Sequence, residues 1–197
     1  GAVMTGANNT AIGRNAGYVL TSGAENVFVG GLAGDGTDDG NFNTAVGYLA
    51  LSANCGSNNT AVGQRALVSS TGDLNTALGK EAGTLMSSGQ RCTFVGALAG
   101  YSASTMEDTV AVGNDAGKFA TTAHSSVFIG ADAGQGITGT KLTGNQNTCV
   151  GAQAGILLQG AAENNTLTGF GAGKAITTGS GNTFLGLNSG SLITTGD

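Results

Sequence analysis

The segment that most resembles a reactive site is glycine-rich and ends in a lysine, at residues 169–174 (GFGAGK). Backbone N–H groups and a lysine charge in such a segment could hold phosphate groups. A phosphate-binding loop also needs a glycine five positions before its Gly-Lys pair and a Ser or Thr after it. Thr168 and Ala175 stand at those positions. The segment therefore does not predict nucleotide binding.

Nucleophilic catalysis needs a base beside the nucleophile, and the chain offers one histidine, His124. It lies in a Thr/Ser-rich stretch, residues 121–126, and we interpret it as a solvated loop residue. The 12 Asp and Glu residues are scattered and form no obvious pair for hydrolysis. The sequence therefore predicts that the protein is not an enzyme.

One acidic, glycine-containing loop is the best candidate for a metal site. It holds Asp35, Asp38 and Asp39, and Ca²⁺ prefers several oxygen ligands on a flexible loop. The spacing matches no EF-hand, so a solvated acidic loop is the alternative, and calcium is the only cofactor suggested. Asp115 and Asp132 occupy equivalent places in successive repeats, where like charges repel unless they are screened or bridged by a cation.

Composition excludes several classes of protein. The 197 residues include 37 Gly, no Pro and no Trp, with 10% charged and 40% hydrophobic residues. Without proline or a three-residue glycine period the chain is not collagen, and this hydrophobic content does not fit disorder. A net charge of −5 with scattered Lys and Arg indicates no nucleic-acid partner. No apolar run is long enough for membrane insertion.

The three cysteines, Cys55, Cys92 and Cys149, are odd in number and widely spaced. This pattern fits neither a disulfide framework nor a zinc site. We interpret them as isolated thiols that fill repeat positions.

A short repeat positions all of these residues. An aliphatic-then-glycine step recurs eleven times, with Thr in place of the aliphatic residue once, at glycine spacings of 16 to 18 residues and one of 21. The consensus is N-T-A-V-G-x-x-A-G followed by a Thr/Ser/Gly-rich loop. The glycines of this step are Gly13, Gly30, Gly47, Gly63, Gly79, Gly96, Gly113, Gly130, Gly151, Gly169 and Gly186.

The Thr-Ala-Val run is short and β-branched, which predicts a strand of three or four residues between glycine turns. One such turn cannot bury its own apolar face, but stacked turns can. The predicted fold is all-β: a parallel β-solenoid of about eleven turns of 16–18 residues, spanning roughly 50 Å at about 4.8 Å per strand. Residues 1–197 form a single repetitive shaft, and both ends fall inside a repeat, so we expect a fragment of a longer fibre.

An asparagine four residues before the glycine recurs in eight repeats. We expect these side chains to form a ladder along one corner, each amide bonding the amides above and below it. The ladder residues are Asn9, Asn26, Asn43, Asn59, Asn75, Asn147, Asn165 and Asn182.

Alternation along the strand separates two apolar faces. The Thr/Val and aliphatic positions are expected inside the coil, and the residue between them outside. That middle position is never polar, so it predicts an interface of a parallel homotrimer; a single wide coil with both faces inside is the alternative. The largest side chains of the predicted interface are Phe28, Phe94, Phe128, Leu167 and Phe184.

Residues 43–51 (NTAVGYLAL) and 59–67 (NTAVGQRAL) resemble the repeats in shafts of trimeric phage tail-fibre proteins. Residues 110–113 (VAVG) are similar to the repeat in heads of trimeric autotransporter adhesins, which are left-handed parallel β-rolls. The resemblance extends over residues 8–197, although the 17-residue period is longer than the usual adhesin-head turn. It implies a trimeric fibre that is extracellular, on a cell surface or on a virion.

The expected function is therefore a structural or adhesive fibre shaft without catalytic activity. Its partners would be identical chains, with a host-surface receptor or glycan as a further partner. One alternative is a self-assembling extracellular filament. Another is an ice-binding solenoid, because Thr occupies the same strand position in eight repeats. Val27, Val110 and Val127 replace Thr there, which suits an interior position better than an exposed lattice.

Overall fold

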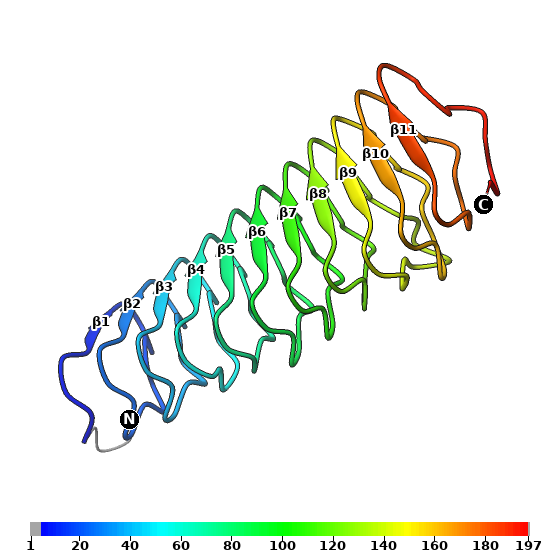
Figure 1. Ribbon diagram of the computed structural model, residues 1–197. Coiled ribbons are helices and arrows are strands. Elements are labelled where there is room, and N and C mark those ends of the chain that lie inside the picture. The colour runs from blue at the N-terminus through cyan, green and yellow to red at the C-terminus, as the bar shows by residue number, and fades with distance from the viewer. Residues whose placement is uncertain (1–4, 197) are drawn as a thin grey trace.

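The computed structural model describes residues 5–196, which wind into one elongated solenoid (Figure 1). All eleven strands have three residues and belong to a single parallel sheet in which each strand pairs with its neighbours in sequence. No helix occurs among the described residues. The predicted all-β parallel solenoid is confirmed. The strands are β1 (Thr10–Ile12), β2 (Val27–Val29), β3 (Thr44–Val46), β4 (Thr60–Val62), β5 (Thr76–Leu78), β6 (Thr93–Val95), β7 (Val110–Val112), β8 (Val127–Ile129), β9 (Thr148–Val150), β10 (Thr166–Thr168) and β11 (Thr183–Leu185).

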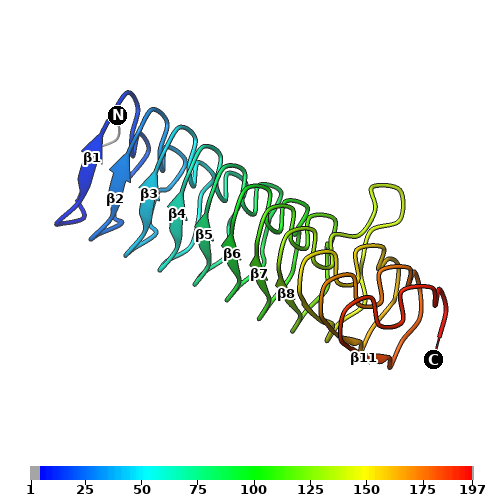
Figure 2. The same ribbon diagram turned by 90° about the horizontal axis from the view of Figure 1, so that it is seen from above.

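A rung is one strand together with the residues that lead to the next strand, and it takes that strand's number. Equivalent residues pair across all rungs, as Ala45 pairs with Ala61. This register survives the longest rung, because Phe128 still pairs with Cys149. The additional residues of rung 8 go into an exposed loop around residues 137–141, which projects from the rod in Figure 2. Insertions therefore lengthen a loop without shifting the sheet.

The glycine that ends each strand is required by the rung beside it. Gly96 has φ 128°, a left-handed conformation, and a Cβ there would lie 2.5 Å from the carbonyl oxygen of Gly113. No side chain fits at that separation. The same close approach recurs at the equivalent glycine of rungs 1 to 10, which explains why the residue is glycine there; Gly186 in the last rung has no such neighbour but keeps a left-handed φ of 121°.

The middle residue of each strand points into the coil, so the predicted placement of these side chains at an intersubunit surface is wrong. Phe28, Phe94, Phe128 and Leu167 are 0% exposed within a single chain, and Phe184 in the last rung is partly buried. These side chains form the hydrophobic core together with the alanines that follow each strand.

Glycine makes room for the aromatic rings inside the narrow coil. A Cβ on Gly34 would lie 2.6 Å from the Phe28 ring. Rung 3 reverses this arrangement: its strand centre is Ala45, and buried Leu51 occupies the position equivalent to Gly34. Each of these rungs therefore fills its interior with one large side chain, supplied from either of two positions.

The outer face of the sheet consists of the first and third side chains of the strands, and we call these 22 side chains the outer strip. They were expected inside the coil, and this assignment is wrong as well. Ile12 is 60% exposed and Leu78 is 48% exposed, while most strip residues in central rungs are half-buried by their neighbours. The middle residues of the strands fill the inside of the single coil, and the outer strip faces outward.

Candidate interaction surface

The expected asparagine ladder is present and lies at a buried corner of the coil. The side-chain amide of Asn26 donates to Oδ1 of Asn9 at 3.1 Å and to the carbonyl of Gly40 at 2.8 Å. Its own Oδ1 accepts the backbone N–H of Asn43 at 2.8 Å. Each amide thus links three successive rungs, which satisfies polar groups that burial would otherwise penalise.

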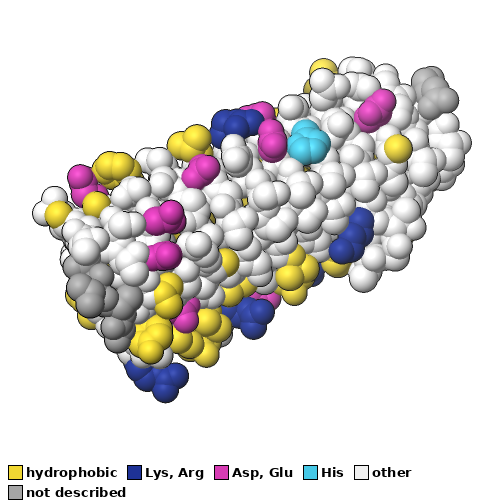
Figure 3. Space-filling model, turned by 90° about the horizontal axis from the view of Figure 1, so that it is seen from below, with side chains coloured by type: hydrophobic (Ala, Val, Ile, Leu, Met, Phe, Trp, Pro, Cys, Tyr) yellow, Lys and Arg dark blue, Asp and Glu magenta, His cyan; other side chains and the backbone are white. Residues whose placement is uncertain are grey.

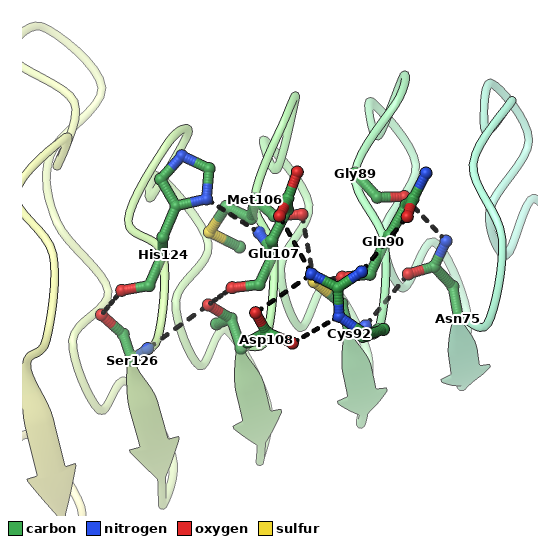
Figure 4. Close-up of polar contacts among 11 residues, drawn as sticks. Asn75, Gly89, Gln90, Cys92, Met106, Glu107, Asp108, His124 and Ser126 are labelled. Atoms are coloured by element: carbon green, nitrogen blue, oxygen red, sulfur yellow. Dashed lines mark hydrogen bonds and ion pairs between the residues drawn. The ribbon is translucent and has the colours of Figure 1, made fainter.

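Cys92, Thr109 and Ser126 take the place of asparagine just before β6, β7 and β8. The N–H of Cys92 donates to Oδ1 of Asn75 at 3.0 Å, and the N–H of Ser126 donates to Oγ1 of Thr109 at 3.4 Å. Figure 4 shows this stretch of the ladder. The N–H of Asn147 then donates to Oγ of Ser126 at 3.2 Å, which returns the column to asparagine.

A second ladder runs along the same corner, two residues before the asparagine column. The N–H of Ala24 donates to Oδ1 of Asn41 at 2.9 Å, and the N–H of Ser57 donates to Oδ1 of Asp73 at 2.6 Å. His124 belongs to this column: its Nδ1 accepts the N–H of Glu107 at 3.1 Å (Figure 4). The interpretation of His124 as a merely solvated loop residue is therefore wrong, because it links two rungs.

The three cysteines are free and buried, as expected for isolated thiols. Burial raises the pKa of Cys55 and Cys92 to about 11 and that of Cys149 to about 12. The reactive form of cysteine is the thiolate. These thiols are therefore packing groups and not nucleophiles.

The acidic loop does not gather its carboxylates. Asp38 accepts a hydrogen bond from the Thr21 hydroxyl of the preceding rung, and its N–H donates to Oδ1 of Asn54 at 3.1 Å. Oδ1 of Asp35 is buried without a partner, and desolvation raises the pKa of that carboxyl. Asp39 joins neither contact. Between residues 5 and 196, no three His, Cys, Asp or Glu side chains come together as a metal-binding group.

The stacked carboxylates of Asp115 and Asp132 are bridged by protein groups. The amide Nε2 of Gln135 lies 3.2 Å from Asp115 Oδ2 and 3.0 Å from Asp132 Oδ1. Lys118 Nζ lies 3.0 Å from the same Asp115 oxygen. An amide and an ammonium group thus relieve the expected repulsion.

Charged groups also meet at the corner that precedes the sheet. Arg91 binds Asp108 through Nε at 2.6 Å and Nη2 at 3.1 Å, and Nη2 lies 3.0 Å from Glu107 Oε2. These bonds hold the pKa of Asp108 below its ordinary value. The cluster lies at the surface, so it contributes little to stability. It is an ion-pair network within the repeat, with no substrate-sized space beside it.

The surface offers no enclosed site. No cavity of ligand size is found in the part of the chain that the structure describes. Figure 3 shows one face as a continuous rod surface on which charged side chains are scattered. The described residues include no helix that could cross a membrane.

The outer strip is an extended surface without charged side chains. Its 22 positions hold nine Thr and thirteen Val, Ile or Leu residues, and no charged side chain. Exposed large side chains continue it at both edges: Phe42 and Leu74 lie just before the sheet, and Tyr48 and Phe170 just after it. A surface of this kind is typical of protein interfaces.

These features define the class of protein as a single-chain parallel β-solenoid with one apolar sheet face turned outward. Comparison with protein-family models, curated proteins and solved structures found no match to the chain. The argument for function therefore depends on the geometry of the rod and its strip.

Proposed function

We propose that the chain is a structural segment of an elongated fibre, a shaft that holds other parts of an assembly apart. The outer strip carries this proposal, because it runs through all eleven strands, and no pocket is found beside it between residues 5 and 196. Rungs are joined along the axis by backbone bonds, such as Gly79 N–H to the Val62 carbonyl at 2.8 Å. A cell-surface or virion fibre, as the repeat resemblance implies, is the setting we propose, with identical chains as its first partners.

Electron microscopy of the purified chain tests this proposal. Discrete rods of roughly 50 Å are expected, because each of the eleven rungs adds about 4.8 Å. Long threads would instead assign the chain to a self-assembling filament. Compact particles with no long axis would contradict both.

Ice binding is a second candidate, because the threonine column lies on the outside of the sheet. Thr44, Thr60, Thr76 and Thr93 follow one another on successive strands and are half-exposed. The reason for disfavouring this function from the sequence, an interior threonine column, is therefore removed. A thermal-hysteresis assay distinguishes the candidates: a fibre shaft gives no ice shaping, whereas an ice-binding face does, and Thr60→Lys with Thr76→Lys would abolish it.

A further inference from the structure

The outer strip is large enough to form a stable interface. Two of about seventeen residues in each rung belong to the strip, and a proportionate share of the 7818 Å² accessible surface is on the order of 900 Å². Standard interfaces bury about 800 Å² from each partner. Exposed apolar patches of this extent mark interaction sites.

Identical repeat spacing favours a second copy of this chain as the occupant. The strip presents a row of side chains for every strand, about 4.8 Å apart. A copy has the same spacing along its full length, so its rows can lie between these rows over all rungs. The strip contains no charge that would repel an identical face.

The two edges of the strip carry opposite charge in the first five rungs. Before the sheet lie Glu25, two residues before β2, and Asp73, three residues before β5. After the sheet lie Arg14, Arg65 and Lys80. Lys80 is 64% exposed at its side chain, and its one acidic neighbour, Glu81, is 3.8 Å away.

This charge pattern selects the orientation of the copy. Rotation about an axis parallel to the rod lays the edge before each strand of one chain against the edge after the same strand of the other, so that Asp73 faces Lys80 across β5 and Glu25 lies one strand from Arg14. Reversing the direction of one rod sets Glu25 near Glu163 before β10 and Asp73 near Glu107 and Asp108 before β7, and like charges placed across an interface are unfavourable. We propose that the outer strip seats a parallel copy of this chain, with the edge before each strand facing the edge after the equivalent strand of the neighbour. This inference deepens the fibre proposal and rests on it.

Native mass by light scattering tests the contact, with matched variants in rung 4. Val62 lies in the strip and Val68 lies outside it, and both are half-exposed. The native chain is expected at two or three times 19.0 kDa. Val62→Lys should weaken association on the order of 100-fold, because it buries an unpaired charge, and Val68→Lys should leave the mass unchanged. Circular dichroism confirms that each variant keeps the sheet.

Charge reversal and a distance measurement test the orientation. Arg14→Glu should weaken association, and adding Glu25→Arg should restore it. A spin label on Ser22→Cys, an exposed site near one end, should give a short distance between copies, well below the roughly 50 Å rod length.

Three results would overturn the inference: a monomer at tens of micromolar, equal dissociation by Val68→Lys, or a label distance close to the rod length. A monomer that forms rods would leave the fibre proposal standing while this contact fails. A monomer that shapes ice would indicate that the strip binds ice and not a second copy of the chain. A compact, multimeric particle would instead remove the fibre proposal.

Discussion

Replacing Phe94 measures directly which face of the strand lies inside the coil. Its ring is 0% exposed, so Phe94→Ala removes a fully buried aromatic side chain. Such truncations cost about 3–5 kcal/mol, because transfer energy and a cavity term add. Val95 is the matched control, since it is adjacent, half-exposed and in the outer strip, and Val95→Ala should cost under about 1 kcal/mol.

A second substitution refills the cavity in the way that rungs 3 and 4 already do. Gly100 is equivalent to Leu51 and Leu67, which adopt left-handed φ values of 52° and 49°. Gly100→Leu alone should be destabilising by roughly 2–4 kcal/mol, because its Cβ would lie 2.5 Å from the Phe94 ring and leucine is strained there. Together with Phe94→Ala it recreates the Ala–Leu pair of rung 3.

The assay is urea unfolding followed by circular dichroism, at a protein concentration where the association state is the same for all variants. The double variant should be more stable than the sum of the single effects predicts, by at least about 2 kcal/mol. A cost below about 1 kcal/mol for Phe94→Ala, accompanied by dissociation of an oligomer, would refute the reasoning. It would place the ring on an intersubunit surface.

Four further predictions follow. Because burial raises the thiol pKa values from 9.0 to about 11–12, their contribution to stability is full below about pH 9 and is lost as pH rises through 11 to 12. The urea midpoint should therefore fall between pH 8 and pH 10.5, and less so when all three cysteines are alanine. His124→Asn should keep native stability because Asn145 makes the same bond one rung away, whereas His124→Ala should cost about 1 kcal/mol in the same assay. Asn59→Ala should cost about 2–4 kcal/mol, since it strands the N–H of Asn75 and the carbonyl of Gly72. Limited trypsin digestion followed by mass spectrometry should cut first at Lys141, in the exposed loop of rung 8; cutting first at Lys80 would contradict this.

The repeat made the fold predictable, because eleven copies of one strand-and-glycine step leave few arrangements other than a stacked coil. The asparagine ladder was predictable for the same reason, because asparagine recurs at one position of the repeat. The face of each strand that we predicted to lie inside the coil is the wrong one, although the sequence contained evidence for the correct one. Asparagine and the middle strand residue are two positions apart and share a face, so a buried amide ladder places Phe94 inside as well.

A second signal was that a large residue at one position accompanies a small one at the other: Phe28 occurs with Gly34, and Ala45 occurs with Leu51. Such compensation is expected within one core and not across separate surfaces. The ladder that includes His124 was harder to predict. Asn, Asp, Ser and His all serve as acceptors there, so no single residue type repeats along the column.

The backbone hydrogen bonds between rungs run along the rod, which determines how it responds to tension. Each rung occupies about 4.8 Å of the axis but contains about seventeen residues, or about 58 Å of extended chain. A force that pulls the two ends apart acts first on the terminal rung. When that rung detaches, its chain extends from about 4.8 Å to about 58 Å, more than a tenfold increase in its length. Successive rungs would then peel off one at a time, so that the rod yields in steps and absorbs work over a long extension without breaking a covalent bond.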